Sequence, residues 1–136
     1  MKYWLMKTEP ETFSFERLAK EKTTIWDGVR NFQARNFMSQ MKKDDLVLIY
    51  HSGKNPQVLG VGRVAKEHYL DPTDNTGKFL SVDIAYEHPL KKPVTLAEIK
   101  MNSKLKNLLL VRQSRLSVMP IEKLEWDEII KMSRHL

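Results

Sequence analysis

The chain has 136 residues, a length typical of one domain with its own hydrophobic core. Apolar residues make up 41% and charged residues 29%, as in folded globular proteins rather than disordered or membrane-spanning ones. The absence of cysteine excludes a disulfide framework, a cysteine-ligated metal site and a cysteine nucleophile. We therefore expect a single domain over residues 1–136, cytoplasmic, with no signal peptide or membrane span.

The positive charge is concentrated in one part of the chain. Lys and Arg number 23 against 17 Asp and Glu, which gives a net charge of +6. Residues 91–115 hold seven Lys and Arg against a single acid, Glu98, so this segment accounts for the whole excess. A basic block on an otherwise neutral chain favours a polyanionic partner such as nucleic acid. A solvated lysine-rich surface is the alternative interpretation.

Hydrophobic periodicity and turn residues predict the order of the secondary structure. The predicted elements are a strand at 3–7, a short helix capped by Ser14, a helix at 31–42, strands at 46–51, 58–67 and 80–87, a basic loop flanked by Pro89 and Pro93, a helix opened by the capping box Thr95–Glu98, a helical turn near 105–109, a strand at 115–119 and a helix at 121–132 opened by Pro120. Three central strands follow one another with no helix between them, which predicts antiparallel hairpins. We expect an α+β fold, with a small curled sheet or barrel and helices packed on its ends.

Several motifs with chemical associations do not fit their surroundings. Gly60–Ala65 matches the dinucleotide-binding fingerprint, but the glycines lie in a strand pattern with no helix after them. Two glycines on one strand face leave room for a neighbouring backbone or for a flat ligand. The histidines have no partner at metal-ligand spacing, and there is no nucleophile elbow or phosphate-binding loop. We expect no metal, no cofactor and no catalytic residue.

Three segments combine aromatic, amide, hydroxyl and charged side chains. They are Lys7–Pro10, Trp26–Asn36 and Tyr50–Ser52. This mixture suits the recognition of a planar heterocycle, because an aromatic ring stacks on a base while amides and hydroxyls read its edge. Arginines in the second segment suit phosphates. Each segment also has a structural interpretation: Trp26 as a core aromatic, and Arg30 and Asn31 as turn and capping residues.

In combination, these motifs resemble the EVE family of the PUA-like superfamily, over nearly the whole length. The resemblance rests on Tyr3–Pro10, Trp26–Asn31, Gln33–Asn36, Tyr50–Ser52, Gly60–Gly62, Asp71–Thr73, Pro93–Leu96 and Arg115–Val118, which occur in the family's order. It implies a PUA-like β-pseudobarrel of about five or six mixed, mostly antiparallel strands with surrounding helices. It also implies a pocket for a base flipped out of nucleic acid, and a relationship to YTH domains.

The resemblance assigns residues to this pocket by motif. The base-binding residues would be Trp26, Asn31, Tyr50, His51 and Ser52, with sides formed by Lys7, Glu9, Pro10, Leu116, Ser117 and Val118. The phosphate contacts expected from the nearby arginines and the basic segment are Arg30, Arg35, Lys91, Lys92, Lys104, Lys106 and Arg112. One departure is a short loop after Asp71–Thr73, where Phe79 stands in place of the Trp that is common in the family.

Three functions remain open from the sequence. The first is a module that reads a modified base, modified cytosine in DNA above all. The second is an RNA-binding module, as in other PUA-like domains. The third is an enzyme or binder of a small nucleotide-like heterocycle, for which His51, Lys7 and Glu9 are the candidate titratable groups. We expect the first, in a non-catalytic domain that is monomeric and does not bind membranes.

Overall fold

The chain folds around one six-stranded mixed sheet. The computed structural model describes residues 1–134. In chain order, the elements are β1 (Tyr3–Thr8), α1 (Phe15–Glu21), β2 (Thr23–Trp26), α2 (Phe32–Met38), β3 (Leu46–His51), β4 (Gln57–Leu70), β5 (Leu80–Thr95), α3 (Leu96–Met101), the 3-10 helix η1 (Ser103–Leu105), α4 (Leu109–Arg112), β6 (Val118–Ile121) and α5 (Lys123–Met132).

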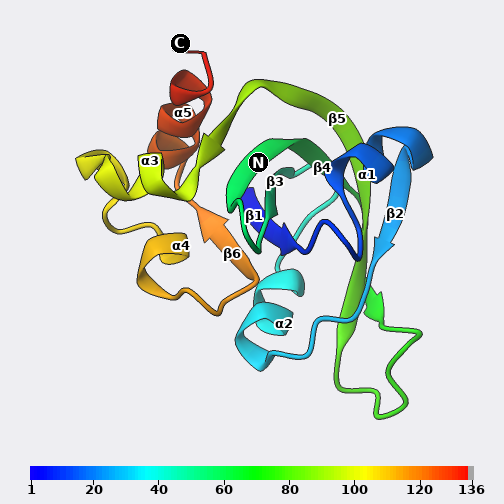
Figure 1. Cartoon of the computed structure of the whole chain (residues 1–136). Helices are drawn as coiled ribbons and strands as arrows, with labels where there is room; N and C mark the ends of the chain where they lie inside the picture. The colour runs from blue at the N-terminus through cyan, green and yellow to red at the C-terminus, as the bar shows by residue number, and fades with distance from the viewer. Residues whose placement is uncertain (135–136) are drawn as a thin grey trace.

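The sheet has the strand order β2-β5-β4-β3-β1-β6. β1 runs parallel to β3, and every other neighbouring pair is antiparallel. In Figure 1 the long strands β4 and β5 curl around β1 and β3, so the sheet closes toward a barrel. The expected α+β fold with mixed, mostly antiparallel strands is confirmed, including the three central strands in antiparallel order.

Irregular pairing between β4 and β5 lets the sheet curl. The register shifts at four places, and one shift moves the partner from Val94 to Pro89 as β4 passes from Val58 to Gly60. Such bulges bend a strand and increase its twist. The sequence prediction of a basic loop at 89–93 was therefore wrong. Proline is tolerated in a strand where the ladder is already interrupted, and β5 continues to Thr95.

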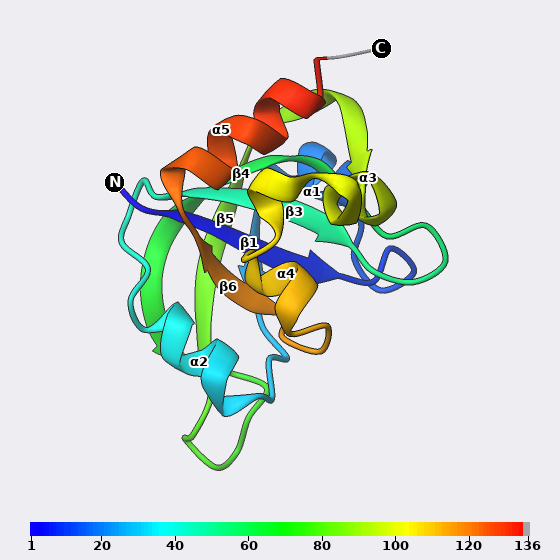
Figure 2. The ribbon, with the colours of Figure 1, turned by 90° about the vertical axis from the view of Figure 1, so that its left-hand side faces the viewer.

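Helices cover the sheet around a hydrophobic core. Trp4, Leu48 and Ile84 are buried in that core, which also takes the inner faces of α1, α2 and α5. Figure 2 shows α2, α4 and α5 on the side of the sheet that carries β6. Asp45 is a buried carboxylate next to the core, where it accepts a 3.0 Å hydrogen bond from the Trp4 indole N–H.

Other elements also differ from the sequence prediction, including β4, which extends to Leu70, and β6, which begins at Val118. The four-residue strand β2 was not predicted, because it is too short to show a period. The second helix ends at Met38, not at residue 42, because Gln40 and Met41 form tighter turns that keep Met41 buried. Pro120 does not open the last helix. It lies in the edge strand β6 opposite Trp4, where a missing N–H is tolerated, and Glu122 caps α5 instead.

The two strand glycines accommodate close neighbours. A Cβ atom at Gly60 would overlap the Phe15 ring, and one at Gly62 would lie 2.9 Å from Ile84 Cγ2 and 3.0 Å from the Ala85 carbonyl. The space beside Gly62 is thus filled by a neighbouring strand, as the first of the two sequence interpretations predicted. The space beside Gly60 is filled by the first residue of α1, so neither glycine leaves room for a flat ligand.

Candidate functional site

A cavity of about 620 Å³ opens beside the end of β1 and the end of β2. Its walls come from β1 and the turn after it, from α1, from β2 with the segment that follows, and from the residue before β6. The lining residues are Lys7, Thr8, Glu9, Thr12, Phe13, Arg17, Thr24, Ile25, Trp26, Asp27, Gly28, Val29, Arg30 and Ser117. The cavity therefore combines two aromatic rings with hydroxyl, carboxylate and cationic groups, and we call it the pocket.

Trp26 forms the apolar wall of the pocket. It is the last residue of β2, pairs with Val82 of β5, and is only 7% exposed. Its indole meets the Phe13 ring edge-to-face, with 6.2 Å between centroids and 78° between planes. Phe13 is held by its backbone, because its carbonyl accepts a 2.7 Å hydrogen bond from Thr8 Oγ1 and its N–H donates to the Glu9 carbonyl. Both rings are thus fixed in the absence of any ligand.

Lys7 adds a cation to the lining of the pocket. Its Nζ donates a 2.8 Å hydrogen bond to the Ser114 carbonyl and lies 5.7 Å from the centroid of the Tyr50 ring. Burial lowers the pKa of Lys7. Burial of Tyr50 raises the pKa of its phenol, so the ring beside the Lys7 ammonium stays neutral. The ammonium group is oriented toward the segment before β6 rather than free in solvent.

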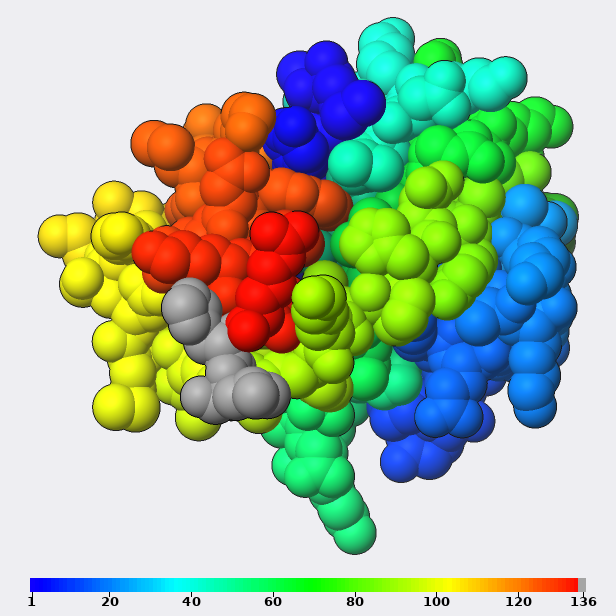
Figure 3. All heavy atoms as spheres, turned by 90° about the horizontal axis from the view of Figure 1, so that it is seen from above, coloured from blue at the N-terminus to red at the C-terminus, as the bar shows by residue number. Residues whose placement is uncertain are grey.

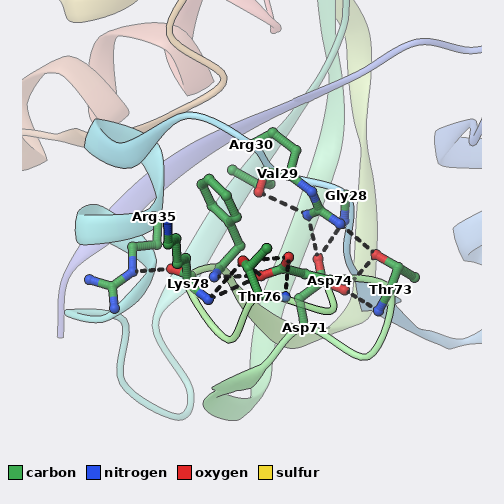
Figure 4. A network of polar contacts seen from close by, with 10 residues as sticks. Gly28, Val29, Arg30, Arg35, Asp71, Thr73, Asp74, Thr76 and Lys78 are labelled. Atoms are coloured by element: carbon green, nitrogen blue, oxygen red, sulfur yellow. Dashed lines mark hydrogen bonds and ion pairs between the residues drawn. The ribbon is translucent and has the colours of Figure 1, made fainter.

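Asp71 joins the pocket to the loop between β4 and β5 (Figure 4). Its buried carboxylate accepts hydrogen bonds from Gly28 N–H (2.9 Å), Arg30 Nη1 (2.9 Å), Thr73 N–H (2.7 Å) and Thr73 Oγ1 (2.6 Å). Burial by itself would raise the pKa of Asp71, but these donors hold it at about 2. Gly28 adopts a φ of 79°, which turns its N–H toward the carboxylate.

Arg30 is fixed between the pocket and this loop. Its Nη1 pairs with Asp71, and its Nη2 donates a 2.9 Å hydrogen bond to Thr73 Oγ1. The side chain remains 41% exposed, so part of the guanidinium faces solvent at the pocket rim. Position and charge are therefore both set before any ligand binds.

The comparisons with known proteins agree with this architecture. A family model described as the EVE domain matches residues 2–132. The chain belongs to the EVE family. Human thymocyte nuclear protein 1 is 34% identical over 164 aligned residues, which cover 96% of this chain and 73% of that protein. A crystal structure from Agrobacterium tumefaciens has a TM-score of 0.94 at 39% identity, covering 98% of this chain and 94% of the other.

One solved relative of this EVE domain carries a ligand. The crystal structure of human THYN1 in complex with DNA containing 5-methylcytosine has a TM-score of 0.94 at 32% identity, and covers 100% of this chain and 99% of that one. A YTH domain from Zygosaccharomyces rouxii, solved with N6-methyladenosine RNA, has a TM-score of 0.60 at 12% identity over 99% of this chain and 88% of the other, and shares the fold alone. The resemblance to a PUA-like EVE domain is confirmed.

The EVE-domain structure brings some of the sequence-predicted residues together. Lys7, Glu9, Trp26, Arg30 and Ser117 line the pocket. Tyr50 and Val118 are buried in the core, and Pro10 and Ser52 are half-buried outside the lining. Ser52 instead donates its N–H to the Thr8 carbonyl at 3.0 Å, which fixes the end of β1.

His51 lies behind the pocket of the EVE domain and supports α1. Its Nε2 accepts a 2.9 Å hydrogen bond from the Phe15 N–H, so this nitrogen carries no proton. Burial lowers the pKa of His51, while Glu16 and Glu11 act in the opposite direction. A neutral imidazole is thereby maintained as an acceptor at the start of the helix.

A second, smaller cleft of about 310 Å³ adjoins the pocket along the chain. Its lining is polar and contains two arginines but no acid among the residues described: Asn31, Gln33, Arg112, Gln113, Ser114, Arg115 and Leu116. We call it the arginine cleft. Two residues predicted for the base pocket, Asn31 and the buried Leu116, lie in this cleft instead. Asn31 caps α2, because its Oδ1 accepts a 2.9 Å hydrogen bond from the Ala34 N–H.

The predicted phosphate contacts divide into two groups. Arg30 lines the pocket and Arg112 lines the arginine cleft, whereas Arg35 lines neither and donates from Nε to the Lys78 carbonyl at 2.8 Å. The lysines line neither cavity, although the Lys106 carbonyl accepts a 3.0 Å hydrogen bond from Arg112 Nε beside the arginine cleft. Lys92 is 3.7 Å from Glu98 and Lys104 is 3.8 Å from Glu128, while Lys91 and Lys106 are exposed. Figure 3 shows the segment of α3 and η1, in yellow, across the molecule from α1 and β2, in blue.

Sequence reasoning missed part of the pocket wall. Phe13, Arg17 and Ile25 line the pocket, and Asp71 holds it in shape. The Asp-Pro-Thr motif at 71–73 was visible in the sequence, but no local signal connects it to residues 28–30. Among residues 1–134 no group of His, Asp and Glu is arranged to hold a metal ion. None of the helices within that range has the length and apolar character needed to cross a membrane.

Proposed function

We propose that this EVE domain is a non-catalytic module that binds DNA and reads a modified cytosine flipped into the pocket. The observation that carries the proposal is the pocket itself, in which Trp26 and Phe13 line the same cavity of about 620 Å³ as Lys7 and Arg30. That space accommodates one base. Human THYN1, an EVE relative with the same fold, is solved in complex with DNA containing 5-methylcytosine.

The energetics require stacking as well as polar contacts. Extracting a base from a duplex costs a few kcal/mol, and stacking on an aromatic ring recovers about 1–3 kcal/mol. Trp26 and Phe13 supply that surface without further ordering, because their positions are set by β2 and by the Thr8–Phe13 hydrogen bond. Lys7, Glu9 and Ser117 lie at the walls to meet the polar edge of the base.

Selectivity for a methyl group rests on fit. One buried methyl group contributes roughly 0.8 kcal/mol, or about a four-fold preference. A larger preference requires that an unmodified cytosine leave a void or an unpaired polar group in the pocket. The fixed positions of Trp26 and Lys7 favour such a penalty, because neither wall is free to collapse onto a smaller base.

Two of the three candidate titratable groups, His51 and Lys7, are engaged in hydrogen bonds within the fold, which supports binding rather than turnover. The acceptor nitrogen of His51 is occupied by the Phe15 N–H, and the Lys7 ammonium is held by the Ser114 carbonyl. Neither group is positioned as a free general base beside the aromatic walls. The arginines at the rim and in the arginine cleft suit the phosphates on either side of a flipped nucleotide, and the more distant lysines supply long-range attraction.

The test is a titration with matched oligonucleotides. Short duplexes that contain cytosine, 5-methylcytosine or 5-hydroxymethylcytosine at one position, as DNA and as RNA, are added at near-physiological salt. Fluorescence of the chain's tryptophans reports binding, because Trp26 lies in the pocket wall while Trp4 is buried in the core. We expect at least a four-fold preference for one modified DNA. Equal affinity for all duplexes would contradict the proposal, and tighter binding of matched RNA would favour the RNA-binding alternative.

Two variants change the apolar wall of the pocket without changing its charge: Trp26→Phe is the test and Ile25→Ala is its control. Ile25→Ala removes an exposed side chain from the opening, while Trp26→Phe shortens the inner ring. We expect Trp26→Phe to lose modification preference and Ile25→Ala to retain it. The opposite ranking would place the base against the exposed Ile25 rather than against Trp26.

A further inference from the structure

An aromatic pair lies open to solvent beside the pocket. Phe32, the first residue of α2, is 58% exposed, and it is the sole aromatic among the large apolar side chains that are exposed in residues 1–134. Its ring is stacked on Phe79, with 4.9 Å between centroids and 27° between planes. We call Phe32 and Phe79 the aromatic platform. An exposed phenyl ring costs solvation, so its open face calls for an explanation.

The Phe79 side of the platform is held by backbone hydrogen bonds. Phe79 donates its N–H to Asp74 at 3.0 Å and accepts a 3.0 Å hydrogen bond from the Asp71 N–H through its carbonyl. Asp74 also accepts from Thr76, and these donors hold the pKa of Asp74 at about 2. Figure 4 shows Asp71, Asp74 and Thr76 close together in the loop between β4 and β5.

The platform also shares a residue with the pocket. The Arg30 guanidinium, which lines the pocket, lies 5.3 Å from the centroid of the Phe79 ring. The pocket and the platform are therefore separated by one fixed arginine side chain. Two further cations flank the platform along the chain, because Arg35 follows Phe32 by three residues on α2 and Lys78 precedes Phe79 in the loop. Arg35 Nε donates a 2.8 Å hydrogen bond to the Lys78 carbonyl, and neither side chain is in an ion pair within the described chain.

We propose that the aromatic platform is a second base-stacking site, which takes the face of the base next to the one held in the pocket. The inference rests on the proposed function, because flipping one base leaves the face of its neighbour without a stacking partner. An exposed aromatic ring rimmed by arginine and lysine is the combination that binds unstacked bases without reading their identity. The occupant is a nucleobase of the same bound DNA, and Phe32 is its contact.

The experiment compares ligands with and without a neighbouring base. Wild type, Phe32→Leu, Phe32→Trp and Phe32→Ala are titrated with the preferred modified duplex, with its unmodified twin and with the corresponding modified mononucleotide. Phe32→Leu keeps an apolar side chain against Phe79 but has no ring. Leu124→Ala, which truncates an 84% exposed side chain on α5, is the matched control.

We expect Phe32→Ala and Phe32→Leu to bind both duplexes about five- to thirty-fold more weakly than wild type, with an unchanged ratio between them. Binding of the mononucleotide should not change, and Phe32→Trp should retain wild-type affinity. Wild-type affinity in Phe32→Leu, or equal losses for mononucleotide and duplex, would overturn the platform. Absence of modification preference in wild type would instead overturn the proposed function, which the same titration reveals separately.

Discussion

The pocket side and the basic end of the molecule carry charge in different ways. Around the pocket, Arg30 is bound to a buried carboxylate and Lys7 to a backbone carbonyl, so each cation has a fixed position. At the end formed by α3 and η1, Lys104 approaches Glu128 at 3.8 Å with most of its side chain in solvent. Fixed cations select a ligand's shape, whereas mobile ones attract any polyanion. Net charge therefore marks a nucleic-acid partner, but of the basic segment 91–115 only the last residues, Arg112–Arg115, reach the arginine cleft and the lysine of the pocket.

Replacement of Trp26 by alanine is expected to have the largest effect. Trp26→Ala removes a nearly buried indole that also packs on Phe13, so the free energy of unfolding should fall by about 3 kcal/mol and base preference should disappear. Urea denaturation and the duplex titration measure the two effects. Trp126→Ala is a control with the same burial, in α5, that should lose stability but retain preference. Retained preference in Trp26→Ala would separate the aromatic wall from recognition.

Loss of Asp71 should follow in size. Asp71→Ala leaves Gly28 N–H and one side of Arg30 without an acceptor, and we expect a cost of about 2–3 kcal/mol with weaker binding of every duplex. Asp127→Ala removes a carboxylate from an exposed i,i+4 pair and should change stability by less than about 0.5 kcal/mol. Equal effects of the two variants would show that the loop network does not hold the pocket.

The same carboxylate predicts acid sensitivity. The pKa of Asp71 is about 2 in the folded chain against 3.8 for an unperturbed aspartate, so the unfolded chain binds its proton first as the pH falls. Its contribution to stability is complete above about pH 4, and it decreases as the pH falls through 3.8 toward 2. Denaturation midpoints of wild type and Asp71→Asn between pH 5 and 2.5 should converge, and parallel curves would contradict the assignment.

Two charge variants sharpen the comparison between the ends. Arg112→Gln with Arg115→Gln should weaken all duplexes about ten-fold and reduce the salt dependence, because both side chains line the arginine cleft. Lys104→Glu with Lys106→Glu should also weaken all duplexes, but less, because neither lysine lines the pocket or the arginine cleft. Both pairs should leave modification preference unchanged. A larger effect of the lysine pair would move the DNA path to α3 and η1.

The smallest expected effect is a pH dependence near neutrality. Because burial lowers the pKa of His51 below its ordinary 6.5, the unfolded chain takes up the proton first as the pH falls. The contribution of His51 to stability is complete above pH 6.5 and is lost as the pH falls through the lowered pKa of the folded chain. The reason is that a protonated Nε2 no longer accepts a hydrogen bond from the Phe15 N–H. Calorimetry from pH 7.5 to 5.5 should show a shallower decline in melting temperature for His51→Gln than for wild type. The control His68→Gln, at an exposed position, should decline as wild type does.

The sequence determined most of the fold because its strands carry local patterns. Alternation at 80–87, the capping box at Thr95 and the apolar run of β3 each specify their own element, and the family motifs specify the order. Patterns failed where the backbone departs from one period: at the four residues of β2, at the bulges that let β5 pass two prolines, and at Pro120 on an edge strand.

The candidate site likewise has a part that the sequence predicted and a part that only the tertiary structure revealed. Residue types alone made Lys7, Glu9, Trp26 and Arg30 candidates, the family resemblance added Ser117, and all five line one cavity. Only the tertiary structure decided that His51 supports α1, that Asn31 caps α2 beside a separate cleft, and that Asp71 reaches across more than 40 positions to hold Arg30. Residue types report the chemistry that a segment can perform. The direction in which a side chain points depends on strand pairing and loop closure between distant segments, which no local pattern encodes.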